Sequence, residues 1–330
     1  MFVFFSLTRN TFRECLREPV FFLILASALL LILSFPLFTF FTFNLQVWAI
    51  LESSMAATMF LGFIAAVICS DACMHREAKN GTLLLLLSKP VSRFTFLLAK
   101  VAGIAGCMIV FSVICAIASM TMVLASANPF LVDNYVLLPF VGVCVACGIF
   151  GAGRNFFSGA SFAENTIYSL FLALPVFYAI MYNILKSRLH QIDPQEIQGL
   201  TFVPCSTLLP AMLLLLLAIV LMSMITTATA QRFSLLTNLV FTAVLLLGGL
   251  TASAWFRERL GEDSFWADLC GVLFPAWQNF WMAYPVSHDI AIPLPYVGWM
   301  ALYVVFYGMI WVIWAGVLFH GSELAKDSRV

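Results

Sequence analysis

Residues 71–100 read DACMHREAKN GTLLLLLSKP VSRFTFLLAK and hold seven charged residues, more than any other stretch of 30 residues in the chain. Long apolar runs precede and follow this segment. Charged residues between two apolar runs are expected at a membrane surface, so the segment is predicted to be a loop at one membrane face. A plain solvated loop and a docking site for a soluble partner are both compatible with its charge.

The internal order of this segment predicts a helix-turn-helix arrangement. A short polar helix from about Asp71 to Lys79 is expected to end at Asn80-Gly81, because glycine readily adopts the left-handed conformation that closes a helix. Thr82 can then cap a second short helix, Leu83 to Ser88. Pro90 should end that helix, because the residue before a proline avoids helical geometry.

The composition of the whole chain identifies its class. Of 330 residues, 63% are hydrophobic and 10% are charged, and the mean hydropathy is +1.03. Soluble domains carry about 25% charged residues, so a soluble protein is excluded. The expected fold is an all-α polytopic membrane protein, a bundle of about six to eight transmembrane helices. The net charge is zero and there is no basic tract, so nothing in the sequence points to a nucleic-acid partner and none is expected.

Eight apolar runs are candidate spans. They cover about residues 20–38, 48–70, 96–125, 135–151, 167–185, 208–228, 233–251 and 296–319. If the N-terminus lies inside, the outer segments hold only four of the 16 Lys and Arg residues, namely Lys186, Arg188, Arg257 and Arg259. This asymmetry predicts that both termini are cytoplasmic.

Residues 1–19 are expected to form an amphipathic helix in the headgroup region, an elbow before the first span. Arg9, Arg13 and Arg17 recur every four residues and would form one basic stripe. Phe12 and Leu16 can contribute to an apolar face. An ordinary basic N-terminus that only sets orientation is the alternative.

Two further polar segments carry expectations. Residues 252–295 mix charged residues with tryptophans, a pattern typical of membrane interfaces, and are expected to form an outer interfacial segment. Residues 154–164 are expected to be a short polar loop. This loop is either a second, smaller contact for a partner or a plain connection.

The chain shows no pattern of a catalytic or metal site. Its nine cysteines are scattered and its four histidines are far apart, so no metal ligands and no catalytic residues are assigned. Cys144-x-x-Cys147 lies in an apolar run and is expected to be a packing pair. Cys205 and Cys270 lie in segments placed outside and could form a disulfide. No Gly-x-x-x-x-Gly-Lys-Ser/Thr loop is present, so any ATP would be bound by a separate chain, and no cofactor is expected in this one.

The central segment resembles a known family. Its pattern Glu77-x3-Gly81-Thr82-Leu83-x3-Leu87-Ser88-x-Pro90-Val91-x-Arg93, followed by Lys100, is similar to the first cytoplasmic loop of the ABC-2 type transporter permeases. It looks most like the branch that includes permeases of multi-copper enzyme maturation and gliding operons. The tail resembles this branch more weakly, through Phe319, Glu323 and Leu324.

The resemblance implies a coupling loop over residues 71–94 that docks on a cytoplasmic ATPase. Arg76, Glu77 and Lys79 would make polar contacts to the ATPase, and Gly81 and Thr82 would shape the turn. Pro90 and Arg93 would set where the third span enters the bilayer.

The function implied by the resemblance is that of a permease subunit of an ATP-driven exporter in a bacterial inner membrane. Two permease chains, identical or paralogous, would line the pathway among membrane lipids. A typical member of the family has six spans. A secondary carrier or a membrane scaffold without an ATPase is the alternative. A carrier is expected to have ionisable groups deep in its spans, and no acidic residue falls near the middle of a predicted span.

Overall fold

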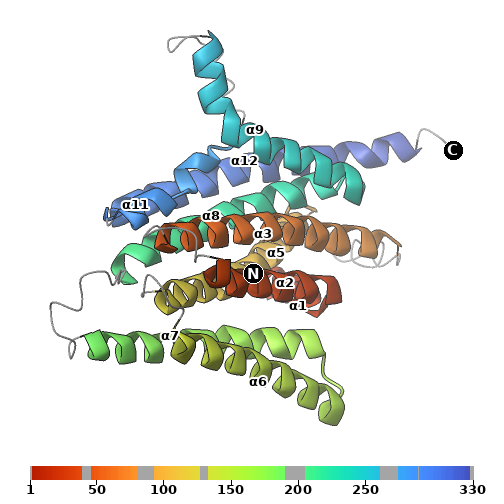
Figure 1. Ribbon diagram of the computed structural model, residues 1–330. Coiled ribbons are helices and arrows are strands. Elements are labelled where there is room, and N and C mark those ends of the chain that lie inside the picture. The colour runs from red at the N-terminus through yellow and green to blue at the C-terminus, as the bar shows by residue number, and fades with distance from the viewer. Residues whose placement is uncertain are drawn as a thin grey trace.

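A computed structural model describes residues 2–38, 46–79, 93–126, 133–189, 205–260, 274–288 and 290–327, and every regular element in these ranges is a helix (Figure 1). The elements are α1 (Phe2–Arg17), α2 (Pro19–Phe38), α3 (Gln46–Lys79), α5 (Arg93–Ala125), α6 (Asn134–Ser158), α7 (Phe162–Leu189), α8 (Cys205–Ala230), α9 (Leu235–Leu260), the 3-10 helix η2 (Trp277–Phe280), α11 (Ala283–Ser287) and α12 (Leu294–Asp327).

Seven of the described helices are long and apolar enough to cross a membrane: α2, α3, α5, α6, α7, α8 and α12. The apolar part of α9, Leu235–Thr251, is shorter. Within hydrocarbon, a backbone must satisfy its own hydrogen bonds, and a helix does so within one segment. The prediction of an all-α polytopic membrane protein is therefore confirmed.

Successive long helices alternate in direction, so several of their charged ends gather at one side of the bundle (right side of Figure 1). We call this side the basic end: α1 ends there at Arg17, α3 at Lys79, α6 four residues after Arg154 and α8 two residues before Arg232, and α5 begins there at Arg93. The C-terminal part of α12 extends toward the same side. The opposite end holds η2 and α11.

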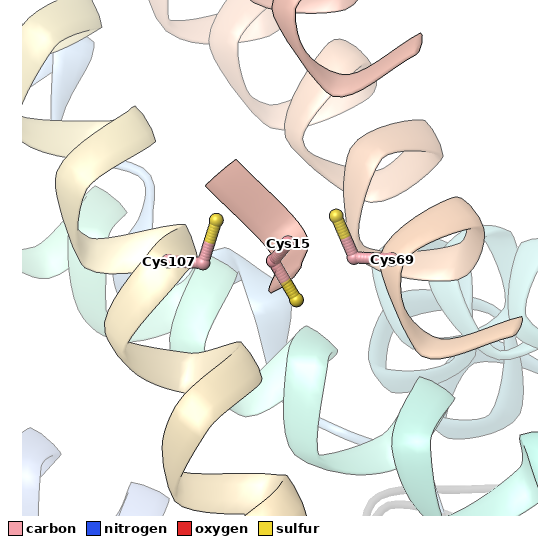
Figure 2. Close-up of side chains that lie close together, drawn as sticks. All are labelled: Cys15, Cys69 and Cys107. Atoms are coloured by element: carbon pink, nitrogen blue, oxygen red, sulfur yellow. The ribbon is translucent and has the colours of Figure 1, made fainter. Parts of the chain in front are cut away.

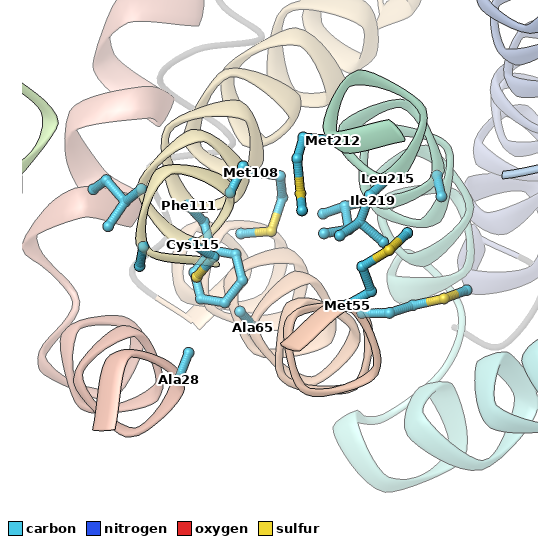
Figure 3. Packing of buried hydrophobic residues seen from close by; sticks show 14 of the residues in the cluster. Ala28, Met55, Ala65, Met108, Phe111, Cys115, Met212, Leu215 and Ile219 are labelled. Atoms are coloured by element: carbon cyan, nitrogen blue, oxygen red, sulfur yellow. The ribbon is translucent and has the colours of Figure 1, made fainter. Parts of the chain in front are cut away.

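The core forms where α3, α5 and α8 pack together. In Figure 3, Met108 and Phe111 of α5 and Ile219 of α8 meet above Ala65 of α3. All four side chains are buried. A Cβ atom on Gly62 of α3 would lie 3.1 Å from Ile219 Cδ1, so the small residue allows α8 to approach closely.

Helix α3 is longer than a bilayer requires. Its 34 residues span about 51 Å, whereas the hydrocarbon core is about 30 Å thick. Its apolar sequence gives way to charged residues from Asp71 onward, including Arg76, Glu77 and Lys79, so its last turns lie beyond the apolar part. The expected separate helix over residues 71–79 is instead the last part of α3. The expected turn at Asn80-Gly81 and the second helix, Leu83 to Ser88, lie outside the described residues.

The N-terminal helix is separate from the first span. Helix α1 ends at Arg17, and Pro19 begins α2 after a single intervening residue, Glu18. Proline at the first helical position costs no hydrogen bond, while it disfavours a helical conformation in the residue before it. Helix α1 packs closely on α5 at Gly103, where no side chain separates the two helices. A Cβ atom on Gly103 would lie only 2.7 Å from Thr11 Cβ.

The connection between α6 and α7 is shorter than the sequence suggests. The expected loop over residues 154–164 is reduced to residues 159–161. Gly159 adopts a left-handed conformation with φ of 63° and donates its N–H to Asn155 O, which ends α6. Arg154 therefore lies in α6 and Glu164 in the first turn of α7.

The aromatic segment before α12 packs into the protein. Trp277 and Phe280 were expected among lipid headgroups, yet both are buried, and Trp277 Nε1 donates to Leu245 O at 3.1 Å. The glycine pair Gly248-Gly249 of α9 explains this difference. Without side chains, these glycines leave room for Phe274 and Trp277.

This packing predicts that Gly249→Ala destabilises the protein. The added Cβ would lie 2.5 Å from Trp277 Cδ1 and would also contact Pro275 O. Overpacking of this kind costs about 1–3 kcal/mol, which should lower the thermal unfolding midpoint in detergent. The control is Gly298→Ala in α12, where no atom lies within 4 Å of the added Cβ. Equal midpoints for both variants would contradict the packing.

Candidate coupling site

The extension of α3 carries the residues that the sequence assigns to docking. Their side chains lie outside the described residues, but the backbone of Arg76, Glu77 and Lys79 forms the end of α3. Arg93 is the first residue of α5. Gly81, Thr82 and Pro90 lie outside the described residues. The structure therefore places the two helix ends that flank residues 80–92, and the docking roles remain predictions.

A buried lysine connects these two helices. Lys100 of α5 is only 2% exposed, and its ammonium donates to the carbonyl of Cys73 in α3 at 2.9 Å. The same ammonium lies 5.7 Å from the ring centre of Phe96. A buried charge is costly unless polar or aromatic groups stabilise it. Lys100 therefore links α5 to the part of α3 that precedes residues 80–92.

Hydroxyl and amide groups connect α3 to α8 and α9 at the same end. Ser70 Oγ lies 3.1 Å from the hydroxyls of both Thr226 and Thr227 of α8. Asn238 of α9 donates to Thr226 O at 3.2 Å and accepts from the hydroxyl of Thr229. Side-chain hydrogen bonds between membrane helices contribute about 0.6 kcal/mol each. Together, these hydrogen bonds therefore hold α3, α8 and α9 in fixed positions relative to one another.

An ion-pair cluster connects the N-terminal helix to α7. Arg13 Nε lies 3.0 Å from Glu164 Oε1, and Arg17 Nε lies 2.6 Å from Glu164 Oε2. The Glu164 side chain is 9% exposed, whereas the two arginines are 44% and 53% exposed. The carboxylate also lies in the first turn of α7, where the helix dipole stabilises negative charge.

The role of Glu164 was missed from sequence, where residues 154–164 were treated as a loop. One signal was available: Glu164 is the only acidic residue between Asp133 and Asp193. Arg13 and Arg17, two of the three arginines in the basic stripe, thus pair with Glu164 and remain exposed enough to contact lipid headgroups as well. The headgroup location of residues 1–19 remains a prediction.

The turn between α6 and α7 presents an aromatic surface at the basic end. Phe156 and Phe157 are 84% and 88% exposed, and their rings pack edge to face with centroids 5.3 Å apart. They follow Arg154 in the last turns of α6. Exposed aromatic rings next to a cation are suited to a protein or lipid contact.

The cysteines are less scattered in space than in sequence. Among the described residues, Cys15, Cys69 and Cys107 form one cluster of buried thiols. Two further expectations concerned cysteines outside this cluster. Cys147 is buried and Cys144 packs against the core, as expected for a packing pair. Cys205 is a free thiol, and Cys270 lies outside the described residues, so their pairing stays untested.

Comparison with known proteins identifies the family. A family model described as "ABC-2 family transporter protein" matches residues 16–180, which is half of the chain. The chain belongs to the ABC-2 transporter family. The match runs from the end of α1 into α7 and includes residues 71–94 of this ABC-2 protein. Searches of curated proteins and of solved structures gave no match.

Membership confirms the resemblance seen in residues 77–100, while the branch within the family stays a prediction. It also establishes the general role of the chain. An ABC-2 protein of this kind is a multi-pass membrane component of a transporter rather than an enzyme.

The ion-pair cluster predicts that Glu164→Gln weakens the attachment of α1. Because both arginines are about half exposed, solvent screens the pairs and the cost should be about 1 kcal/mol. The thermal unfolding midpoint in detergent should fall accordingly. Arg154→Gln, which removes an exposed arginine at the same end, is the control.

A double-mutant cycle tests whether this effect belongs to the pair. Arg17→Gln combined with Glu164→Gln should destabilise the protein by less than the sum of the single variants, because the second change finds the contact already lost. Strict additivity would show that Arg17 and Glu164 do not interact.

Proposed function

We propose that this ABC-2 protein is the permease subunit of an ATP-driven exporter in a bacterial cytoplasmic membrane. A separate cytoplasmic ATPase would bind ATP and dock on residues 71–94. The observation that carries the proposal is the continuity of α3, which runs without a break from the core at Met55 to Lys79. A force applied to residues 80–92 would reach the core through one helix.

The polar contacts at the basic end suit this transmission. Residues 80–92 join the end of α3 to the start of α5, so an ATPase that moves this segment would act on both helices. The contact between Lys100 and the Cys73 carbonyl would make α3 and α5 move together. The hydroxyl contacts of Ser70 would extend the movement to α8.

The N-terminal helix offers a second route. Helix α1 packs on α5 at Gly103 and is paired with Glu164 of α7. A displacement of α5 would thus pass through α1 to the α6–α7 hairpin. Phe156 and Phe157 at the tip of this hairpin are suited to be the second, smaller contact with the ATPase.

The proposed assembly contains two permease chains, identical or paralogous, surrounded by lipid. The positive-inside rule favours a cytoplasmic location for the basic end and for both termini. ATP binding would close the ATPase dimer, and the spans would alternate between inward-open and outward-open states. Export is the direction implied by the resemblance to the family.

The first experiment is co-purification with the ABC ATPase of the same operon in mild detergent. We expect a stable complex that hydrolyses ATP. Replacing Glu77→Arg together with Gly81→Trp should abolish the complex, because the change reverses a docking charge and fills the turn. Lys186→Glu, at the opposite end of α7, is the matched charge-reversal control. If no ATPase binds to the wild type, the secondary-carrier or scaffold alternative replaces this proposal.

A second prediction separates docking from transmission. Lys100→Met removes the buried ammonium but leaves residues 71–94 unchanged. The ATPase should still co-purify, while the stimulation of its hydrolysis by the permease should fall by about two- to thirtyfold, the range expected for coupling energies of 0.5–2 kcal/mol. Lys186→Met, which removes an exposed lysine, should change neither quantity. Unchanged stimulation in Lys100→Met would remove Lys100 from the coupling route.

A further inference from the structure

Three cysteines from three helices meet at one buried point (Figure 2). Cys15 comes from α1, Cys69 from α3 and Cys107 from α5, and their sulfur atoms all lie within 4.8 Å of one another. All three residues are fully buried. A fourth cysteine, Cys73 of α3, places its Sγ atom 3.2 Å from that of Cys15. We propose that this cysteine cluster binds a thiophilic d10 cation, Zn²⁺ or Cu⁺.

The separations between the sulfur atoms fit such an ion. Zinc binds thiolates at about 2.3 Å in tetrahedral geometry, which places neighbouring sulfurs about 3.8 Å apart. The cluster therefore needs only small side-chain movements to close around an ion. Cys69 and Cys73 are four residues apart and lie on one face of α3. Cys15 and Cys107 complete the set from the neighbouring helices.

The choice of ion follows from the chemistry of the donors. Sulfur ligands select soft or borderline cations such as Zn²⁺ and Cu⁺, whereas Mg²⁺ and Ca²⁺ need oxygen ligands. Glu14 and Asp71, the carboxylates closest in sequence to Cys15 and to Cys69, are not members of the cluster.

A disulfide is a weaker explanation of the same geometry. Oxidation of Cys15 and Cys73 would join two of the four thiols and would need an oxidant. The basic end, proposed to face the cytoplasm, would be in a reducing compartment, where structural disulfides are rare. A single ion would use three or four of the thiols at once.

The charge of the site can be balanced locally. Binding converts three S–H groups to thiolates and releases three protons, so Zn²⁺ with three thiolates carries a net charge of −1. The Lys100 ammonium donates to the backbone carbonyl of Cys73 and is itself buried. A positive charge beside the cluster lowers the cost of a negative metal–thiolate site in an apolar interior.

The bound ion would fasten α1 to α3 and α5. It would add a third attachment for α1, next to the Gly103 contact and the Glu164 ion pairs. Because the cluster is fully buried, loading would require α1 to move away, and the ion should then exchange slowly. This inference does not depend on ATPase docking.

The test is metal analysis of the full chain purified in detergent without chelators. Elemental mass spectrometry should find about one Zn or Cu per chain, the stoichiometry of a single structural site. Which element is found distinguishes the two ions. In the Cys69→Ala/Cys107→Ala variant this content should fall at least tenfold. Cys115→Ala is the matched control, because Cys115 is an equally buried cysteine of α5 outside the cluster.

A second measurement tests the proposal even if the Cys69→Ala/Cys107→Ala variant does not fold. Wild-type and Cys115→Ala protein produced in medium with added Co²⁺ should show thiolate-to-cobalt charge-transfer absorption and intense bands of tetrahedral cobalt. The proposal is overturned if the wild type holds neither zinc nor copper and shows no cobalt bands. It is also overturned if a folded Cys69→Ala/Cys107→Ala variant keeps its full metal content, because the ion then lies elsewhere.

Discussion

The uninterrupted length of α3 is the constraint on which the rest of the structure depends. A helix of 34 residues cannot be contained in a hydrocarbon layer of about 30 Å, so one end must enter a polar region. The buried part of α3 packs on α5 and α8, while its polar end continues toward residues 80–92. The packed core and residues 71–79, which begin the predicted coupling loop, are thus parts of one continuous helix, as an ABC-2 permease would need if a soluble partner is to move its spans.

The sequence alone predicts those structural features that depend on a single property of the residues, such as their hydrophobicity. Apolar runs of about 20 residues predict spans, because unpaired backbone groups are too costly in lipid for any other structure. Pro19, the first residue of α2, fits the break that separates α1 from α2. The sequence suggested which segment carries the candidate site. It did not predict how the side chains there are arranged, because they contact residues of other helices.

Contacts between helices could not be predicted, because they depend on rotation and crossing angle. The cysteine cluster joins residues far apart in sequence, and no spacing along the chain indicates that Cys15, Cys69 and Cys107 face one point. Trp277 shows the same difficulty in another form. A tryptophan among charges is typical of an interface, and only the space above Gly249 makes burial in protein the better solution.

The uneven burial of the spans suggests how movement could be divided within the molecule. About two thirds of an apolar stretch of 18 residues is buried in α5 and in α8, against 22% in α6 and in α7. The α6–α7 hairpin therefore has fewer contacts to break when it moves, whereas α3, α5 and α8 would have to move together. The ion pairs of Glu164 lie where these two parts meet, on the short path from α1 to α7. Ion pairs formed by half-exposed arginines are individually weak, so a contact of this kind can hold the hairpin in place and still release it when the core moves.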